Sequence, residues 1–230
     1  MPEERFTRKL MEQALYNSIS NSHFQEQIEK YTLPYRELMA YYRCAMMEIA
    51  TKFNVLDEEL SLQYDRNPIE NIKTRLKSME SIAGKAARLK IPLSPESIEK
   101  SIFDIAGVRV ICSFPSDIYT LSEALLKQDD VALVQRKDYI ASPKANGYLS
   151  LHLIVETPIF LLDRKKLMKV EVQFRTISMD WWASLEHKIR YKKDVAIPPE
   201  IASELYNCAE IGARLDQRME AIQKRIEAEG

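Results

Sequence analysis

Glycine, histidine and cysteine are scarce in this sequence, and each shortage excludes a class of site. The chain of 230 residues has five glycines, three histidines and three cysteines. No GxGxxG or GxxxxGK[ST] segment occurs, which argues against the two commonest glycine-rich nucleotide loops. The histidines are too dispersed for a histidine metal site, and neither HExxH nor GxSxG is present. Cys44, Cys112 and Cys208 are scattered and odd in number, so neither a disulfide framework nor a zinc site is expected.

A charge excess, a long apolar run and a signal sequence are also missing. The chain has 33 basic and 34 acidic residues, and a net charge of -1 does not indicate a general electrostatic grip on nucleic acid. No run approaches the length of a membrane span, and the N-terminus MPEERFTRKLMEQAL lacks the apolar segment of a signal peptide. We therefore expect no membrane partner and a cytoplasmic location. Apolar residues make up 46% of the chain, enough for one sizeable core.

The periodicity of the sequence changes from helical to strand-like and back to helical. An amphipathic segment runs from Leu10 to Ile28, Pro34 is expected to end it, and a second helix continues to Ile49. Five strand-like segments, separated by short helices, then follow: IKTRLK (72–77), GVRVICSF (107–114), VALVQRKDYI (131–140), SLHLIVET (150–157) and KLMKVEVQFRT (166–176). From Thr176 the pattern is helical to the end, with a break predicted at residues 197–199.

This order of elements predicts an α+β fold, with a mixed five-stranded sheet flanked by helices. No internal repeat, low-complexity segment or clear linker divides the chain. We therefore expect one domain over residues 1–230, consisting of a helical N-terminal extension over about 1–58, a catalytic α/β core over about 59–195 and C-terminal helices over about 196–230.

Three cations near the first strand form a candidate phosphate site. Arg75 and Lys77 are two residues apart on a strand and point the same way, and Lys85 follows one short helix later. Several converging cations suit a polyphosphate, whose oxygens need several donors. For RLK alone, a solvated basic face is the commoner outcome.

Two carboxylates lie beside apolar residues and form a candidate metal site. Asp104 stands between a helix end and a strand start, and Glu171 lies mid-strand in VEVQFRT. Two such acids on different strands suit Mg²⁺ held between protein and phosphate oxygens. For each acid alone a structural role is favoured: Asp104 as a local cap, or Glu171 as an exposed residue paired with Arg175.

The segment DYIASPKANGYLSLH (138–152) contains more polar side chains than a turn requires. Pro143 and Asn146-Gly147 are ordinary turn residues, whereas Tyr148 and His152 add an aromatic ring and a titratable group. A tyrosine at this junction stacks on a purine base or covers the edge of a core. Together with guanidinium groups, which stack on bases, these side chains indicate an enzyme acting on nucleotide phosphates.

A family resemblance sharpens this interpretation. RLKSMESIAGK, DIAGVRVIC, KDYIASPKANGYLSLH, VEVQFRT and WWASLEHKIRYK occur in the order found in the synthetase domain of the RelA/SpoT homologues. The resemblance covers residues from about 60 to 195, with no room for the hydrolase or regulatory domains of the long members. The chain therefore resembles a small alarmone synthetase, and the resemblance implies a nucleotidyltransferase-like fold.

The resemblance implies an activity, GTP diphosphokinase, and the residues that serve it. Such enzymes transfer the β,γ-pyrophosphate of ATP to the 3′-hydroxyl of GDP or GTP in the stringent response, giving AMP and ppGpp or pppGpp. By motif position, the ATP-binding residues would be Arg75, Lys77, Lys85 and Arg109. The GDP- or GTP-binding residues would be Lys137, Lys144, Tyr148, His152 and Gln173. Asp104 would bind Mg²⁺, and Glu171 would assist the metal and act as general base.

One departure concerns the acceptor, and the resemblance also implies partners. Many members carry Arg-x-Lys-Asp before the tyrosine loop, whereas this chain has Gln135-Arg136-Lys137-Asp138, which leaves the choice between GDP and GTP open.

Small members are often homotetramers, and an alarmone at a second site or single-stranded RNA stays open as a further partner. Two alternatives keep the scaffold: transfer to an adenine nucleotide or a tRNA end, and a non-catalytic regulator that binds an alarmone or RNA.

Overall fold

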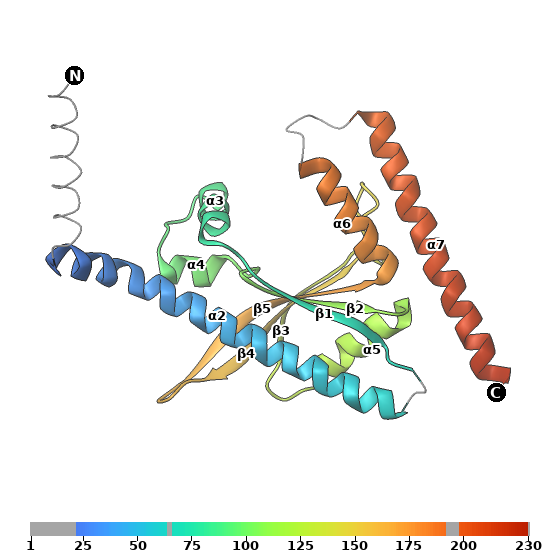
Figure 1. Cartoon of the computed structure of the whole chain (residues 1–230), viewed down its shortest axis with the longest axis horizontal. Coiled ribbons are helices and arrows are strands. Elements are labelled where there is room, and N and C mark those ends of the chain that lie inside the picture. Colours follow the sequence, from blue (N-terminus) through green and yellow to red (C-terminus); the bar gives the residue numbers. More distant parts are fainter. Residues whose placement is uncertain (1–21, 64–65, 192–197, 230) are drawn as a thin grey trace, which may run out of the picture.

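A mixed five-stranded sheet forms the centre of the fold (Figure 1). The computed structural model describes residues 22–63, 66–191 and 198–229. The strands are β1 (Ile69–Leu76), β2 (Ala106–Cys112), β3 (Ala132–Asp138), β4 (Leu151–Phe160) and β5 (Lys165–Thr176). Their order across the sheet is β1-β2-β5-β4-β3; β2 and β5 run parallel, and the other neighbouring strands are antiparallel. The predicted α+β fold with a mixed five-stranded sheet is confirmed.

The helices cover both faces of this sheet. They are α2 (Ser22–Gln63), α3 (Met79–Leu89), α4 (Pro95–Ser101), α5 (Pro115–Leu126), α6 (Ile177–Tyr191) and α7 (Pro199–Glu229). In Figure 1, α2 and α5 lie on one side of the sheet, α3 and α6 on the other, and α7 runs alongside α6. None of the helices described is long and apolar enough to cross a membrane.

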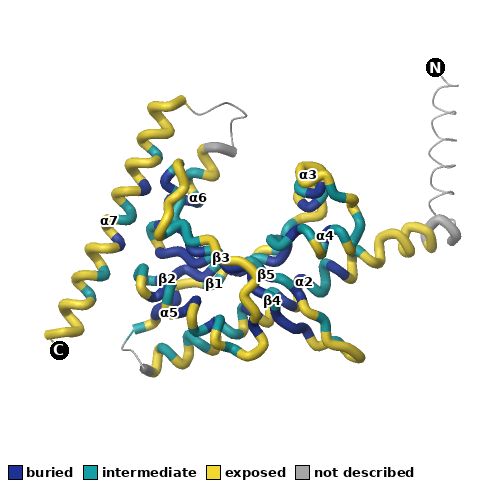
Figure 2. The backbone as a smooth tube through the Cα atoms, turned by 180° about the vertical axis from the view of Figure 1, so that it is seen from behind, coloured by how far each residue is buried: buried dark blue, intermediate teal, exposed yellow. Residues whose placement is uncertain are grey.

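The core forms where α2 packs on the sheet. Leu38, Tyr42, Ala45, Ile49 and Phe53 recur at helical spacing on α2 and are almost fully buried. The Phe53 ring meets Phe174 of β5 edge to face, with 5.5 Å between centroids. Each large apolar side chain buried in this way contributes roughly 1.5–3 kcal/mol to stability. Figure 2 shows buried residues in the central strands and on the faces of α2 and α5 that meet them, whereas α7 is largely exposed.

The prediction that Pro34 ends a helix is wrong, because α2 continues through it from Ser22 to Gln63. Proline lacks the N–H that would bond to the carbonyl of Lys30 and crowds that carbonyl. Both residues are exposed, so water can satisfy the carbonyl, and the turns that follow are held by packing on the sheet. The predicted helical residues up to Ile19 lie outside the described ranges. Ile197, in the predicted break, also lies outside them, and α7 begins two residues later, at Pro199.

Strand register places polar side chains in two rows on the face opposite α2. Alternation sends Val108, Val110, Val172 and Phe174 into the core and their strand neighbours to the other face. One row of cross-strand neighbours is Lys73, Arg109, Gln173, His152 and Lys137. The next row is Arg75, Gly107, Glu171, Ile154 and Gln135. Residues from all five strands thus meet on one surface, although they are up to a hundred positions apart in the sequence.

Candidate active site

Two clefts open on this polar face, and both are lined by Asp104 and Glu171. The first cleft, of about 790 Å³, is lined by these two acids and by residues of β1, β2, β5 and α3, among them Lys73, Arg75, Lys77, Arg88, Arg109 and Gln173. The second cleft, of about 410 Å³, lies toward β3 and β4, and its lining includes Lys85, Gln135, Lys137, Tyr139, Lys144 and His152. Two carboxylates therefore stand where two cation-lined clefts meet.

Asp104 is held between two lysines from different elements. Lys77 Nζ donates to Asp104 Oδ2 at 2.7 Å, and Lys85 Nζ lies 2.8 Å from Oδ1. Helix α3 brings Lys85 to this position, and Ser78 caps its N-terminus, because Ser78 Oγ accepts the Ser81 N–H at 3.2 Å. Burial alone raises the pKa of the Asp104 carboxyl, but the two ammonium groups outweigh it, so the pKa lies below its ordinary value. The carboxylate is therefore ionised at neutral pH.

Glu171 receives hydrogen bonds from two neighbouring strand residues. His152 Nδ1 lies 3.2 Å from Glu171 Oε1, and Gln173 Nε2 donates to Oε2 at 2.9 Å. Burial raises the pKa of the Glu171 carboxyl, yet the contacts with His152 and Gln173 hold it below its ordinary value. The structural alternative for Glu171, pairing with Arg175, is wrong, because Arg175 pairs with Asp180 of α6. Glu171 is left ionised, half-buried and facing both clefts.

The loop of residues 143–148 forms the predicted Asn-Gly turn. Gly147 N–H donates to the Lys144 carbonyl at 2.8 Å, and Gly147 has a φ of 88°, which favours glycine. Lys144 Nζ lies 4.5 Å from the centroid of the Tyr139 ring and 4.8 Å from that of Tyr148. Tyr139 lines the second cleft, whereas the Tyr148 ring packs against a small cluster around Trp182. The turn therefore holds an ammonium group between two aromatic rings at the edge of the second cleft.

The comparisons with known proteins show the family to which the chain belongs. A family model described as "Region found in RelA / SpoT proteins" matches residues 74–196. GTP pyrophosphokinase YwaC of Bacillus subtilis (strain 168) is 46% identical over 186 residues, which are 81% of this chain and 89% of the relative. The chain belongs to the RelA/SpoT family. The matched range contains all eleven site residues predicted from the sequence, together with Arg88 and Tyr139.

Solved structures of the RelA/SpoT family have the same fold. Small alarmone synthetase 2 of Bacillus subtilis superposes with a TM-score of 0.75 at 44% identity, covering 83% of this chain and 98% of that one. Small alarmone synthetase 1 of the same organism, bound to its product pppGpp, also gives 0.75 at 35% identity, covering 87% and 98%. The resemblance to small alarmone synthetases inferred from the sequence is confirmed at the level of family and fold.

The predicted site residues of this RelA/SpoT chain fall into three groups. Arg75, Lys77 and Arg109 line the first cleft, whereas Lys85, Lys137, Lys144 and His152 line the second. Gln173 lines the first cleft, although the resemblance assigned it to the acceptor. Tyr148 is absent from the lining of both clefts and reaches the site through its hydroxyl, which lies 2.8 Å from His152 Nε2.

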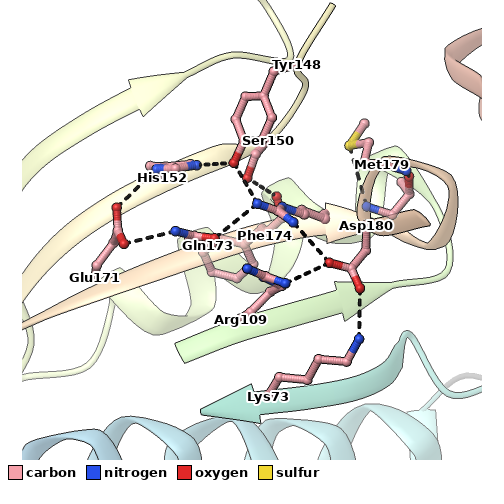
Figure 3. Close-up of polar contacts among 12 residues, drawn as sticks. Lys73, Arg109, Tyr148, Ser150, His152, Glu171, Gln173, Phe174, Met179 and Asp180 are labelled. Carbon is pink, nitrogen blue, oxygen red and sulfur yellow. Dashed lines mark hydrogen bonds and ion pairs between the residues drawn. The ribbon is translucent and has the colours of Figure 1, made fainter. Parts of the chain in front are cut away.

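Several residues at the site were not predicted from the sequence, among them Lys73, Arg88, Tyr139, Arg175 and Asp180. Arg88 is one helical turn beyond Lys85 on α3, a spacing that would have identified it. Tyr139 follows Lys137 by two residues, so strand alternation gave a signal for it as well. Figure 3 shows Asp180 in a polar network with Arg109 and Lys73, and Arg175 Nη1 also donates to Asp180 Oδ1. Nothing local in the sequence marks Asp180, because its partners come from three strands.

A metal would need ligands from outside the protein at this site. Within the described residues, no three His, Cys, Asp or Glu side chains converge to form a complete metal site. Asp104 Oδ1 is buried, and its partner in the structure is the Lys85 ammonium group at 2.8 Å. Mg²⁺ usually binds one or two carboxylates together with substrate phosphates and water, so Asp104 and Glu171 would be sufficient as its protein ligands.

Proposed function

We propose that this chain is an alarmone synthetase of the small, single-domain type. It transfers the β,γ-pyrophosphate of ATP to the 3′-hydroxyl of GDP or GTP, giving AMP and ppGpp or pppGpp. The observation that carries this proposal is the pair of cation-lined clefts that share Asp104 and Glu171. A reaction between two nucleotides needs two binding sites that meet at the reacting atoms. The names of the relatives, a GTP pyrophosphokinase and a small alarmone synthetase bound to pppGpp, support the same reaction.

ATP occupies the first cleft in this proposal. Arg75 and Arg109 lie on neighbouring strands that border the cleft, and their guanidinium groups stack on the two sides of the adenine. Lys77 and Lys85 reach Asp104 from the first and the second cleft respectively. The transferred pyrophosphate lies at that junction, so one cation from each side neutralises it throughout the transfer.

The acceptor occupies the second cleft with its phosphates on a basic wall. Lys137, Lys144 and His152 supply donors to those phosphates, and Gln173 orients the nucleotide from its position beside Glu171. Tyr148 provides a ring on which the guanine stacks once Lys144 moves from the ring to a phosphate. This arrangement directs the 3′-hydroxyl toward Glu171.

Magnesium fits the two acids at the junction. Asp104 would hold it through the buried Oδ1, with Glu171 as the second carboxylate and phosphate oxygens and water completing the shell. Bound there, the cation would reduce the negative charge on the attacked pyrophosphate. Lys77 and Lys85, which balance Asp104 in the structure, would then be free to contact phosphate oxygens.

Glu171 acts as the general base. Because its pKa lies below the ordinary value, the carboxylate is ionised and ready to accept the proton of the 3′-hydroxyl. The hydroxyl oxygen forms a bond to the β-phosphorus of ATP, and the bond from that phosphorus to the oxygen bridging the α-phosphate breaks. AMP leaves with the bridging oxygen, and the proton remains on Glu171 until solvent removes it.

A product assay tests the proposal directly. Purified protein is incubated with Mg²⁺, labelled ATP and, in separate reactions, GDP, GTP, an adenine nucleotide or tRNA. We expect AMP and 3′-pyrophosphorylated guanosine nucleotides in the first two reactions only. Glu171→Gln should lower kcat by roughly 10²- to 10⁴-fold while nucleotide binding persists, since it removes the base and one carboxylate at the metal but none of the cations that bind phosphate. An inactive native enzyme, or a Glu171→Gln variant with native kcat, would show the proposal to be wrong.

We further propose that the protein is a homo-oligomer, a homotetramer by the family resemblance. Helix α7 carries an apolar stripe at coiled-coil-like spacing that the rest of the described chain leaves at least 42% exposed: Ile211, Leu215, Met219, Ile222 and Ile226. A second copy of the chain would bury this stripe. Light scattering after size exclusion measures the mass, and Leu215→Glu with Ile222→Glu should dissociate the assembly. A native monomer would contradict the proposal.

A further inference from the structure

Asp180, in the first turn of α6, is the meeting point of three cations. Lys73 Nζ donates to Asp180 Oδ2 at 2.8 Å, while Arg109 Nη1 and Arg175 Nη1 both donate to Oδ1 at 3.0 Å. The aspartate is 7% exposed and Arg175 is 5% exposed. Burial raises the pKa of the Asp180 carboxyl, but its cationic partners hold the pKa below the ordinary value. The group is therefore a buried anion with a full set of partners.

One of these arginines, Arg109, lies at the first cleft. Arg109 lines that cleft, and in the proposed function its guanidinium stacks on the adenine of ATP. One Nη atom is held by Asp180, which fixes the plane of the guanidinium relative to β2. The neighbouring Arg175 lowers the pKa of Arg109 by charge repulsion, next after burial in effect, whereas Asp180 raises it. Without the shared anion, the two guanidinium groups would repel each other across a short distance.

The other arginine, Arg175, is connected to Glu171 in two ways, one through Tyr148 and His152 and one through Gln173, and Figure 3 shows these last three residues beside Glu171. Arg175 Nη2 donates to the Tyr148 hydroxyl at 2.8 Å and to Gln173 Oε1 at 3.3 Å. Gln173 then donates to Glu171 Oε2, and the Tyr148 hydroxyl lies 2.8 Å from His152 Nε2, whose Nδ1 faces Glu171 Oε1. The five side chains form a closed ring that begins at Arg175 and ends on both oxygens of Glu171.

Every donor in this ring can point toward Glu171. Arginine has only donors, so the tyrosine hydroxyl and the glutamine carbonyl accept from Arg175. A neutral His152 has one N–H, and an ionised Glu171 places that hydrogen on Nδ1, since a nitrogen lone pair facing a carboxylate is unfavourable. The Tyr148 hydroxyl proton is then directed to Nε2. The ring thereby fixes the tautomer of His152 and the orientation of the Gln173 amide.

We propose that Asp180 is a positioning residue that sets both substrate sites through its two arginines. Through Arg109 it orients the platform for ATP, and through Arg175 it orients the ring that aims the Glu171 carboxylate at the acceptor. Asp180 touches neither substrate itself. This inference rests on the proposed function, because the roles of Arg109 and Glu171 come from there.

Removing the charge of Asp180 tests the inference. Asp180→Asn keeps the shape but leaves two guanidinium groups without their anion, so we expect KM for ATP to rise and kcat to fall, each by roughly tenfold. Asp180→Glu, which restores the charge, should recover part of both losses. The matched control is Asp117→Asn, because Asp117 is also buried and paired with an arginine, Arg66, but lies outside both clefts. That control should lose stability and keep native kinetics per folded molecule.

A double-mutant cycle separates positioning from simple loss of structure. In an Arg109→Gln background, Asp180→Asn should raise KM for ATP no further, because Asp180 acts on the ATP site through the Arg109 side chain, which is already absent. Should Asp180→Asn fail to fold, Tyr148→Phe removes the link from Arg175 to His152 and keeps the link through Gln173, so it should lower kcat while KM for ATP stays native. Native kinetics in folded Asp180→Asn, additive effects in the cycle, or native kcat in Tyr148→Phe would overturn the inference.

A binding measurement keeps this test distinct from that of the proposed function. A native chain that makes no alarmone with any acceptor refutes the proposed function whatever Asp180 does. Calorimetric titration with a non-hydrolysable ATP analogue reports the Asp180–Arg109 route without turnover. Unchanged affinity for the analogue in folded Asp180→Asn refutes the ATP part of the inference even if the native enzyme is active.

Discussion

Gly147, in the turn of the loop of residues 143–148, lies directly against Ala209 of helix α7. A Cβ atom at position 147 would stand 2.7 Å from the Ala209 Cβ and 3.4 Å from Tyr206. The C-terminal helix therefore forms the back of the loop that carries Lys144 and Tyr148. Trp182 Nε1 donates to the Leu205 carbonyl at 2.8 Å, which ties this part of α7 to α6.

This contact predicts the effect of Gly147→Ala. The new methyl group would overlap Ala209, and the φ of 88° would be strained, at a cost of about 1–3 kcal/mol. We expect the loop to shift, which raises KM for the guanosine acceptor by tenfold or more, on the order expected for a 1 Å displacement, with KM for ATP nearly unchanged. Steady-state kinetics with each substrate varied in turn measures both values.

Ala209, the residue that Gly147 contacts, supplies the control. Adding Ala209→Gly to Gly147→Ala removes the overlap but leaves the backbone strain, so the double variant should recover part of the acceptor affinity. If Gly147→Ala raises both KM values equally, then α7 supports the whole fold rather than the loop of residues 143–148.

Tyr139 and Tyr148, the two tyrosines near Lys144, can be compared as candidates for the ring that stacks on the guanine. Tyr148→Ala should raise KM for the acceptor by about 5- to 100-fold, the scale of losing one base–aromatic stack, and leave KM for ATP unaltered. Tyr139→Ala is the comparison, because Tyr139 lines the second cleft while Tyr148 lies behind it. A larger acceptor loss in Tyr139→Ala than in Tyr148→Ala would assign the guanine to Tyr139 and contradict the assignment made by resemblance.

The placement of Asp104 predicts how the enzyme depends on Mg²⁺. Asp104→Asn removes the charge at the buried Oδ1, so half-maximal activity should need at least 10- to 100-fold more Mg²⁺, the range seen when residues outside the metal's ligand shell are changed. Binding of metal-free ATP should not weaken, because Lys77 and Lys85 lose their anion and become available to phosphate. Asp163→Asn, an exposed aspartate near Arg164 between β4 and β5, is the control and should match native. An unchanged Mg²⁺ requirement in Asp104→Asn would exclude Asp104 as a ligand.

Much of this site follows from local pattern, and the remainder depends on tertiary structure. Strand alternation was sufficient to place Arg75, Arg109, Glu171 and Gln173 on one face, because a period of two is fixed by the backbone. The order of the strands, which makes Lys73 and Lys137 opposite ends of one row, is not encoded in any local segment. Asp180 escaped prediction for the same reason. The continuity of α2 through Pro34 depends on packing that local propensity does not contain.

The departure at Gln135 predicts acceptor preference. Gln135 and Lys137 both line the second cleft, whereas Arg136 points to the other side, 3.5 Å from Asp138 and over the Tyr119 ring. Gln135→Arg adds a cation beside the acceptor, so the ratio of kcat/KM for GTP to that for GDP should rise by about three- to tenfold, as expected for one partly screened charge. Arg136→Gln removes a cation outside the cleft and should leave the ratio unaltered. A fall in the ratio for Gln135→Arg would place the acceptor phosphates elsewhere.

Two buried aspartates predict opposite changes of stability with pH. The pKa of Asp216 is raised above its ordinary 3.8, chiefly by burial and also by Glu220, because its partners there are only the hydroxyls of Thr176 and Ser178. Near pH 4 the folded chain therefore holds a proton that the unfolded chain has lost, and stability falls as pH rises through this range. Asp216→Asn, whose amide oxygen can still accept from the hydroxyls, should be more stable than native above that range and gain nothing below pH 3.8.

For Asp180 the change of stability with pH has the opposite sign, because its three cationic partners hold the pKa of its carboxyl below 3.8. Its contribution to stability is complete above pH 3.8 and is lost as pH falls through the lower, folded-state pKa. Asp180→Asn should therefore be less stable than native at neutral pH, and the deficit should shrink below pH 3.8. Urea denaturation of both variants from about pH 3 to 7 measures the two profiles. Parallel profiles would mean that burial, and not the surrounding charges, decides the ionisation of both groups.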